Sequence, residues 1–137
     1  MKLISFSVLF LIPALAATAQ SAPRQQKETP VAREQLRTEA AAIEQQVKAN
    51  PADTELYMKL GFAYSRLEQA DDAQRAFEGA VNLEPKKAAA HYMLGLIYEK
   101  KGLRDKAIAA WKACLDNTQD PRMRDTATRH LHHLSHR

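Results

Sequence analysis

The chain carries one pattern twice between residues 54 and 121. Residues 54–87 read TELYMKLGFAYSRLEQADDAQRAFEGAVNLEPKK, and residues 88–121 read AAAHYMLGLIYEKKGLRDKAIAAWKACLDNTQDP. Aligned at a period of 34, the two segments are identical at six positions, the pairs Leu60/Leu94, Gly61/Gly95, Tyr64/Tyr98, Asp71/Asp105, Ala73/Ala107 and Ala76/Ala110. The pairs Phe77/Trp111, Ala80/Cys114 and Val81/Leu115 match in kind. The spacing predicts a helix–turn–helix unit in each segment.

The residue types at these positions have physical reasons. A glycine inside a helix costs about 1 kcal/mol relative to alanine, so Gly61 and Gly95 indicate close approach of a second helix. Ala73 and Ala107 are the expected small partners on that helix. Bulky side chains are expected to fill the space around them: Leu60, Tyr64, Phe77, Leu94, Tyr98 and Trp111.

The turns and helix ends follow the same plan. Asp71 and Asp105 suit the first turn of each second helix, where the helix dipole favours a carboxylate. Pro85 is expected to end the second helix of the first segment, and Gly102 to turn the chain in the second segment.

The 34-residue period and the pattern L-G-x-x-Y…A-x-x-x-[FW]-x-x-[AC] resemble the tetratricopeptide repeat family. Both segments carry this pattern, the first at Leu60, Gly61, Tyr64, Ala73, Phe77 and Ala80, the second at Leu94, Gly95, Tyr98, Ala107, Trp111 and Cys114. The resemblance implies an all-α superhelix of stacked helix pairs.

Both flanks of the repeats are also predicted to be helical. In residues 31–50, Leu36, Ala40, Ile43 and Val47 recur at helical spacing before Asn50-Pro51 ends the helix. A shift of 34 places Ile43 on the aromatic position, so this segment is interpreted as half a repeat. Residues 121–136 lack the Leu-Gly pair, but their apolar stripe predicts a capping helix. The stripe consists of Met123, Ala127, Leu131 and Leu134. About six helices are expected, with full repeats at 54–87 and 88–120.

The first residues are typical of an export signal. Lys2 precedes an apolar-rich run over residues 3–15, and Ala17 and Ala19 form a small-x-small cleavage site. Residues 1–19 are therefore predicted to be a signal peptide cut after Ala19, and residues 20–30 a disordered leader. The alternative is an uncleaved anchor, but a membrane span needs about 20 apolar residues. The expected location is periplasmic or secreted, with no stable membrane insertion after cleavage.

A binding groove follows from the resemblance alone. The family lines its concave surface with repeat positions 2, 5, 9, 12 and 13, which are here Glu55, Met58, Phe62, Ser65, Arg66, Ala89, Tyr92, Leu96, Glu99 and Lys100. Members that clamp a C-terminal carboxylate place Lys and Asn at positions 5 and 9, so that clamp is absent. An apolar groove suits a hydrophobic or amphipathic partner segment. For Met58, cover by the chain's own half repeat is an equal alternative.

Composition excludes several other classes of function. Aromatic residues make up only 7% of the chain, and a single cysteine excludes an internal disulfide framework. Cys114 is expected to be a buried packing thiol, and His91 to be partly buried. No phosphate-binding loop, nucleophile elbow or H-E-x-x-H motif is present, so an enzyme is not expected, and no cofactor is implied. A basic motif interleaved with aromatic residues is also absent, which disfavours nucleic acid.

Two alternatives involve the second half of the chain. Residues 31–85 hold 6 basic and 10 acidic side chains, whereas residues 86–137 hold 11 basic and 5 acidic ones. This asymmetry could drive head-to-tail self-association or attract an acidic partner or anionic lipid. The C-terminal histidines could instead form a metal site: His130, His132, His133 and His136.

The main functional hypothesis is a non-enzymatic, exported adaptor that binds a protein partner in the apolar groove. The segment N-P-A-D-T-E-L-Y-M-K-L-G-F-A-Y, residues 50–64, also resembles periplasmic repeat domains of cytochrome c maturation and other envelope-assembly factors. A periplasmic metal-binding protein is the alternative.

Overall fold

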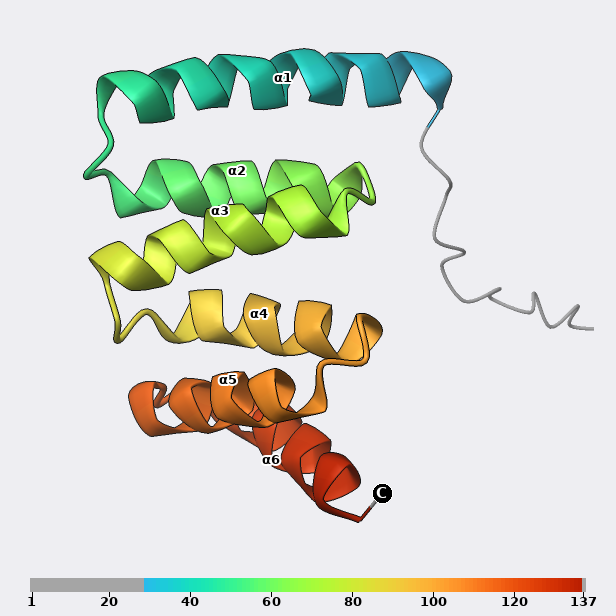
Figure 1. Ribbon diagram of the computed structural model, residues 1–137, viewed down its shortest axis with the longest axis vertical. Coiled ribbons are helices and arrows are strands. Elements are labelled where there is room, and N and C mark those ends of the chain that lie inside the picture. The colour runs from blue at the N-terminus through green and yellow to red at the C-terminus, as the bar shows by residue number, and fades with distance from the viewer. Residues whose placement is uncertain (1–28, 137) are drawn as a thin grey trace, which may run out of the picture.

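A computed structural model describes residues 29–136, and this part of the chain is built from six α-helices without strands. Figure 1 shows the helices stacked in chain order along the long axis, with the C-terminus at the opposite end from α1. Their bounds are α1 Pro30–Ala49, α2 Thr54–Arg66, α3 Ala70–Leu83, α4 Ala88–Lys100, α5 Arg104–Asn117 and α6 Pro121–Ser135. The predicted all-α helical repeat is confirmed.

The start of α1 corrects the predicted leader, which ended at residue 30. Thr29 is instead the N-cap of α1, and its side chain accepts a hydrogen bond from the Ala32 amide at 3.2 Å. Pro30 is the first helical residue, where proline costs no hydrogen bond because that amide lacks a helical partner. The predicted signal peptide, residues 1–19, and residues 20–28 lie outside the described residues.

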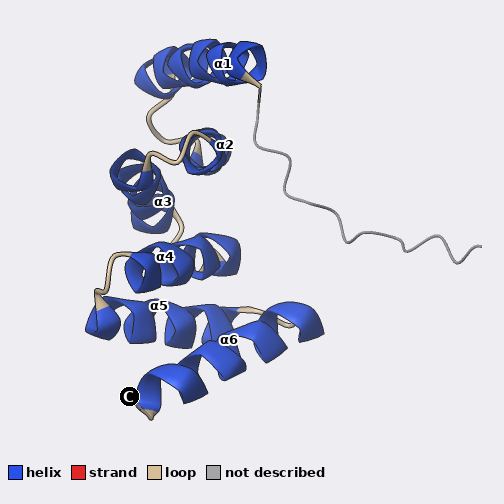
Figure 2. Cartoon of the chain, turned by 90° about the vertical axis from the view of Figure 1, so that its right-hand side faces the viewer, coloured by secondary structure: helices blue, strands red, loops and turns tan. Residues whose placement is uncertain are grey.

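Each helix packs against the helices next to it in the chain. Figure 2 shows the stack from the side, with α2 and α3 lying beside each other between α1 and α4. The buried apolar side chains form two clusters. The smaller joins α1 to α2 and α3, and the larger runs from α2 to α6 around Phe77, Trp111 and Cys114, which are fully buried.

The two repeat glycines explain how each helix pair closes. A Cβ atom on Gly61 would lie 2.6 Å from ring atoms of Phe77, and one on Gly95 would lie 2.6 Å from Trp111. The close approach predicted from the sequence is thus present, and the nearest groups are the rings of Phe77 and Trp111. Gly79 gives a third such contact, 2.5 Å from Tyr57, which the sequence analysis did not identify.

The turns inside the two repeats have the same geometry. Gly102 has a φ of +72°, and Glu68, which lies 34 residues earlier, has a φ of +61°. In both turns the amide of the next residue donates to a carbonyl five residues back, Gln69 to Tyr64 at 2.9 Å and Leu103 to Tyr98 at 2.8 Å. The sequence predicts the turn at Gly102, and the structure repeats it at a position where the residue is not glycine.

A tyrosine–glutamate hydrogen bond recurs between helix pairs. The Tyr98 hydroxyl donates to Glu78 on α3 at 2.7 Å, and the Tyr64 hydroxyl donates to Glu44 on α1. Tyr98 lies 34 residues after Tyr64, and Glu78 lies 34 residues after Glu44. The contact between α1 and α2 therefore repeats in the contact between α3 and α4. This recurrence supports α1 as the second helix of an incomplete repeat.

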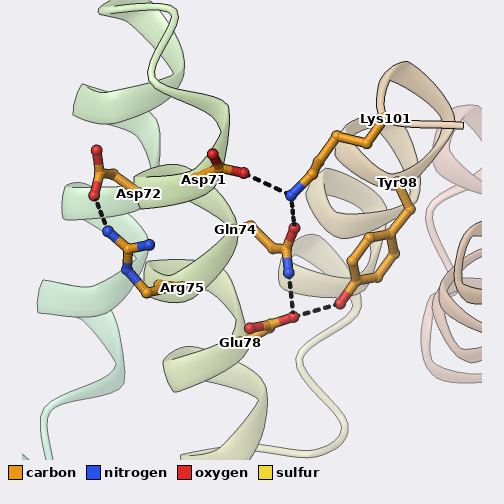
Figure 3. A network of polar contacts seen from close by, with 7 residues as sticks. All are labelled: Asp71, Asp72, Gln74, Arg75, Glu78, Tyr98 and Lys101. Atoms are coloured by element: carbon orange, nitrogen blue, oxygen red, sulfur yellow. Dashed lines mark hydrogen bonds and ion pairs between the residues drawn. The ribbon is translucent and has the colours of Figure 1, made fainter. Parts of the chain in front are cut away.

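The junction between the two repeats carries a longer polar network. Figure 3 shows Lys101 on the α4–α5 turn reaching α3, where its ammonium donates to Asp71 at 2.6 Å and Gln74 at 2.7 Å. Gln74 donates in turn to Glu78 at 2.8 Å, which also accepts the Tyr98 hydroxyl. The hydrogen bond and positive charge of Lys101 lower the pKa of the Asp71 carboxyl. The network fixes the register of α4 on α3.

Candidate protein-binding face

The first helices of the two repeats, α2 and α4, each carry one stripe of exposed or half-buried side chains. On α2 the exposed residues Glu55, Lys59, Phe62 and Arg66 recur at spacings of four, three and four, so they share one face of the helix. The matching residues of α4 are the half-buried Ala89 and Met93 and the exposed Leu96 and Lys100. We call the central part of these stripes the α2/α4 face: Lys59, Phe62, Arg66, Met93, Leu96 and Lys100.

Phe62 and Leu96 are the apolar centre of this face. Phe62 is 45% exposed and Leu96 is 36% exposed, and they occupy the same position of the two repeats. The Phe62 ring meets the buried Phe77 ring edge-on, with centroids 5.3 Å apart. The ring is therefore held in place by the core while much of its surface stays in contact with solvent.

A hollow of about 170 Å³ lies between the α2–α3 turn and α4. Its lining is mainly apolar and comes from both repeats, including Ala73 on α3 and Met93, Leu96 and Ile97 on α4. Ser65, Glu68 and Lys100 provide polar groups in the lining, and Glu68 lies 3.4 Å from an Arg33 guanidinium nitrogen. The hollow can take an apolar side chain with a charged group next to it.

Five other groove residues of the sequence prediction are at least partly accessible. Glu55, Arg66 and Lys100 are exposed, and Ala89 is half-buried. Ser65 is half-buried as well, and its hydroxyl donates to the Gly61 carbonyl at 2.8 Å. Its hydrogen-bonding capacity is thus partly used inside α2.

The prediction that Met58 lines the groove is wrong. Only 5% of Met58 is exposed, because its position on α2 turns it toward α3 and α4 in the larger core cluster. The alternative of cover by the half repeat is also wrong, since α1 contributes no residue to that cluster.

Tyr92 and Glu99 contribute more to the packing of α4 on its neighbouring helices than to the α2/α4 face. The half-buried Tyr92 ring meets the Trp111 ring edge-on at 5.2 Å. Glu99 accepts hydrogen bonds from Trp111 Nε1 at 2.5 Å and lies 2.7 Å from His130 Nδ1. The predicted groove role of Glu99 is corrected accordingly, because its carboxylate is held between α5 and α6.

Lys59 and Met93 were missed by the sequence analysis. Both occupy repeat position 6, which the family-based set of groove positions does not include. The signal that finds Lys59 is the four–three–four spacing with Glu55, Phe62 and Arg66, which marks the solvent side of α2.

The four C-terminal histidines do not form one cluster. The His130 ring stacks on Trp111 with centroids 4.4 Å apart and faces Glu99. His132 and His136 pair with each other, with their Nε2 atoms 3.0 Å apart, and His133 is exposed. Within residues 29–136 no three His, Cys, Asp or Glu side chains are arranged to hold a metal ion. The predicted alternative of a metal site built from all four is therefore corrected.

The two remaining candidates for chemistry are structural, as predicted. Cys114 is fully buried, and burial raises the pKa of its thiol, which keeps it in the protonated, unreactive form. The half-buried His91 has its Nε2 atom 2.7 Å from the Pro85 carbonyl, so it ties the start of α4 to the preceding turn.

The charges around the α2/α4 face are mostly positive. Lys59, Arg66 and Lys100 lie on it. The nearest acidic side chain in the stripe, Glu55, is paired with Lys87, and this hydrogen bond raises the pKa of the Lys87 ammonium. The face therefore combines apolar centres with cations.

The comparison with known families agrees with this geometry. The tetratricopeptide repeat model matches residues 54–87 and 88–121. These are the segments of α2–α3 and α4–α5 with their following turns, so residues 54–121 belong to the tetratricopeptide repeat family, whose members bind protein partners. A search of curated proteins found no match. None of the helices in the described part of the chain is both long and apolar enough to cross a membrane.

Proposed function

We propose that the protein is a non-enzymatic scaffold that binds a segment of a partner protein on the α2/α4 face. The observation that carries this proposal is the exposure of Phe62 and Leu96 at one repeat position, in contrast to the fully buried rings of Phe77 and Trp111 behind them. Each repeat thus buries one aromatic ring completely and leaves a large apolar side chain of its first helix exposed.

The size of this apolar contact sets the strength of binding that it can supply. Full burial of a leucine or phenylalanine side chain contributes about 1.5–3 kcal/mol. Phe62 and Leu96 are already partly buried, so together they supply at most about 3–6 kcal/mol before the cost of association. A micromolar complex needs about 8 kcal/mol. The partner must therefore also use polar contacts or the neighbouring hollow.

Site-specific photo-crosslinking in the native host tests which face binds. A photoreactive amino acid would replace Leu96 on α4 in one strain and the exposed Ala109 on α5 in another. We expect a discrete crosslinked species from position 96 and none from position 109. Equal crosslinking from both positions, or crosslinking from position 109 alone, would contradict the proposal.

We further propose that the chain is exported and acts outside the cytoplasm, in assembly of an envelope complex. Support comes from Lys2, the apolar run over residues 3–15 and the Ala17–Ala19 cleavage pattern. The test is N-terminal sequencing of the protein purified from its native host. We expect Gln20 as the first residue, and a protein that retains Met1 would contradict cleavage.

A further inference from the structure

We infer that the α2/α4 face recognises an acidic amphipathic segment, that is, a short stretch of the partner in which bulky apolar side chains alternate with carboxylates. This inference rests on the proposed function and adds the chemistry of the partner. Its basis is the order of charges around the two exposed apolar residues.

Cations flank the apolar centres on both helices. Lys59 precedes Phe62 by three residues and Arg66 follows it by four, so the three side chains share one face of α2. On α4, Lys100 follows Leu96 by four residues and also lines the hollow. An apolar side chain placed on Phe62 or Leu96 thus meets a positive charge within one helical turn.

The carboxylates near this face are already engaged. Glu55 pairs with Lys87, and Glu68 lies 3.4 Å from an Arg33 guanidinium nitrogen. Glu99 accepts from Trp111 and faces His130. In contrast, Lys59 and Lys100 have no ion-pair partner among residues 29–136. Carboxylates of a partner would form ion pairs with Lys59 and Lys100, whereas a basic partner would be repelled by these two lysines.

The apolar contacts and the charges have different roles in recognition. Exposed ion pairs change affinity only about two- to fivefold each, and salt screens them. They discriminate more strongly between partners, because like charges oppose each other. The apolar residues supply attraction for any hydrophobic segment, and the cations select the acidic ones among them.

The test uses three fluorescent peptides of equal length, measured by anisotropy with the full chain. The first alternates leucines at helical spacing with glutamates, the second replaces the glutamates with lysines, and the third replaces the leucines with serines. We expect the acidic leucine peptide to bind about tenfold more tightly than either of the others. Its affinity should fall as sodium chloride is raised.

Two double variants locate the effect. The charge reversal K59E/K100E should weaken binding of the acidic leucine peptide about tenfold, because two attractive pairs become repulsive. The control K86E/K112E makes the same change in net charge at exposed lysines outside the α2/α4 face and should stay within about twofold of the unaltered protein. Circular dichroism melts verify that both variants remain folded.

These measurements distinguish failure of the acidic selectivity from failure of the proposed protein-binding function. Equal binding of both leucine peptides, or equal losses in the two double variants, overturns the acidic selectivity. If those leucine peptides also lose affinity in Phe62→Ser, the face still binds proteins and the proposed function stands. Failure of the acidic leucine peptide to bind overturns the inference as well. The proposed function is then decided separately by the crosslinking at position 96.

Discussion

The two repeats have the same skeleton but different surroundings for their buried ring. Phe77 and Trp111 are both fully buried against a glycine of the preceding helix. Phe77 carries no polar atom, whereas Trp111 donates a hydrogen bond to Glu99, and His130 of α6 stacks on its ring. The pattern shared by both repeats specifies the packing of their helices. Tryptophan in place of phenylalanine adds contacts that hold the capping helix α6 against the second repeat.

The largest effect is expected from truncating these two rings. Phe77→Ala should lower the free energy of unfolding by about 3–5 kcal/mol because of the cavity it leaves. Trp111→Ala should cost about 1–3 kcal/mol more, since it also leaves the Glu99 carboxylate without a donor. Urea unfolding followed by circular dichroism measures both. If Trp111→Ala were no more destabilising than Phe77→Ala, the hydrogen bond to Glu99 would add nothing.

A smaller loss is expected when the glycines acquire a side chain. In Gly61→Ala and Gly95→Ala, the new Cβ would meet a buried ring at 2.6 Å. Overpacking costs about 1–3 kcal/mol, and the better helix propensity of alanine returns about 1 kcal/mol. We expect net losses of about 1–2 kcal/mol in urea unfolding.

Gly79→Ala provides the matched control for these glycines. Its Cβ would lie 2.5 Å from Tyr57, but that ring is half-buried and can move toward solvent. The loss should therefore be smaller than at Gly61 or Gly95. A larger loss at Gly79 would mean that burial of the opposing ring does not set the cost.

The repeated tyrosines should make stability sensitive to alkaline pH. Burial raises the pKa of both Tyr64 and Tyr98, and the hydrogen bonds to Glu44 and Glu78 add to the shift. A raised folded pKa means that the stabilisation is fully present below the unfolded value, about 10, and is lost as pH rises above it.

The double variant Y64F/Y98F isolates the contribution of the two tyrosine hydroxyls to stability. Near pH 8 it should be less stable than the unaltered protein by about 1 kcal/mol per lost hydrogen bond. Above about pH 10 the difference should narrow, because phenylalanine does not ionise. If urea unfolding gave the same difference in the free energy of unfolding from about pH 8 to pH 11, ionisation of the two hydroxyls would not be linked to folding.

The smallest effect should come from making the two turns alike. Glu68 adopts the left-handed backbone conformation that Gly102 adopts in the second repeat. That conformation costs a residue with a side chain about 1–2 kcal/mol, while glycine loses more freedom on folding. We expect Glu68→Gly to raise the free energy of unfolding by about 0.5–1 kcal/mol, and Gly102→Ala to lower it. Destabilisation by Glu68→Gly would show that the contact with Arg33 outweighs the backbone strain.

The repeat architecture could be predicted from the sequence because its determinants recur. Glycine opposite an aromatic residue 16 positions later is a local pattern, and a period of 34 identifies the partners. The apolar stripe of the capping segment was equally readable, since Ala127 and Leu134 are buried in α6.

The binding face could be predicted only in part. Phe62 and Leu96 follow from their repeat position, but the burial of Met58 depends on how α3 and α4 cover α2, which no local pattern contains. The role of His130 needs contacts between residues 31 positions apart, on α4 and α6. Histidine spacing within the C-terminal segment suggested metal binding, whereas the tertiary fold turns one of those rings onto Trp111.

Nuclear magnetic resonance can map most directly whether the α2/α4 face is where a peptide binds. Amide chemical shifts of the isotope-labelled protein would be followed during titration with the acidic leucine peptide. We expect the shift changes to concentrate on α2 and α4, around Phe62, Met93 and Leu96. A different hollow, of about 300 Å³, is lined by Val81 on α3 and Ala109 on α5. Shifts concentrated around these two residues instead would contradict binding on the α2/α4 face.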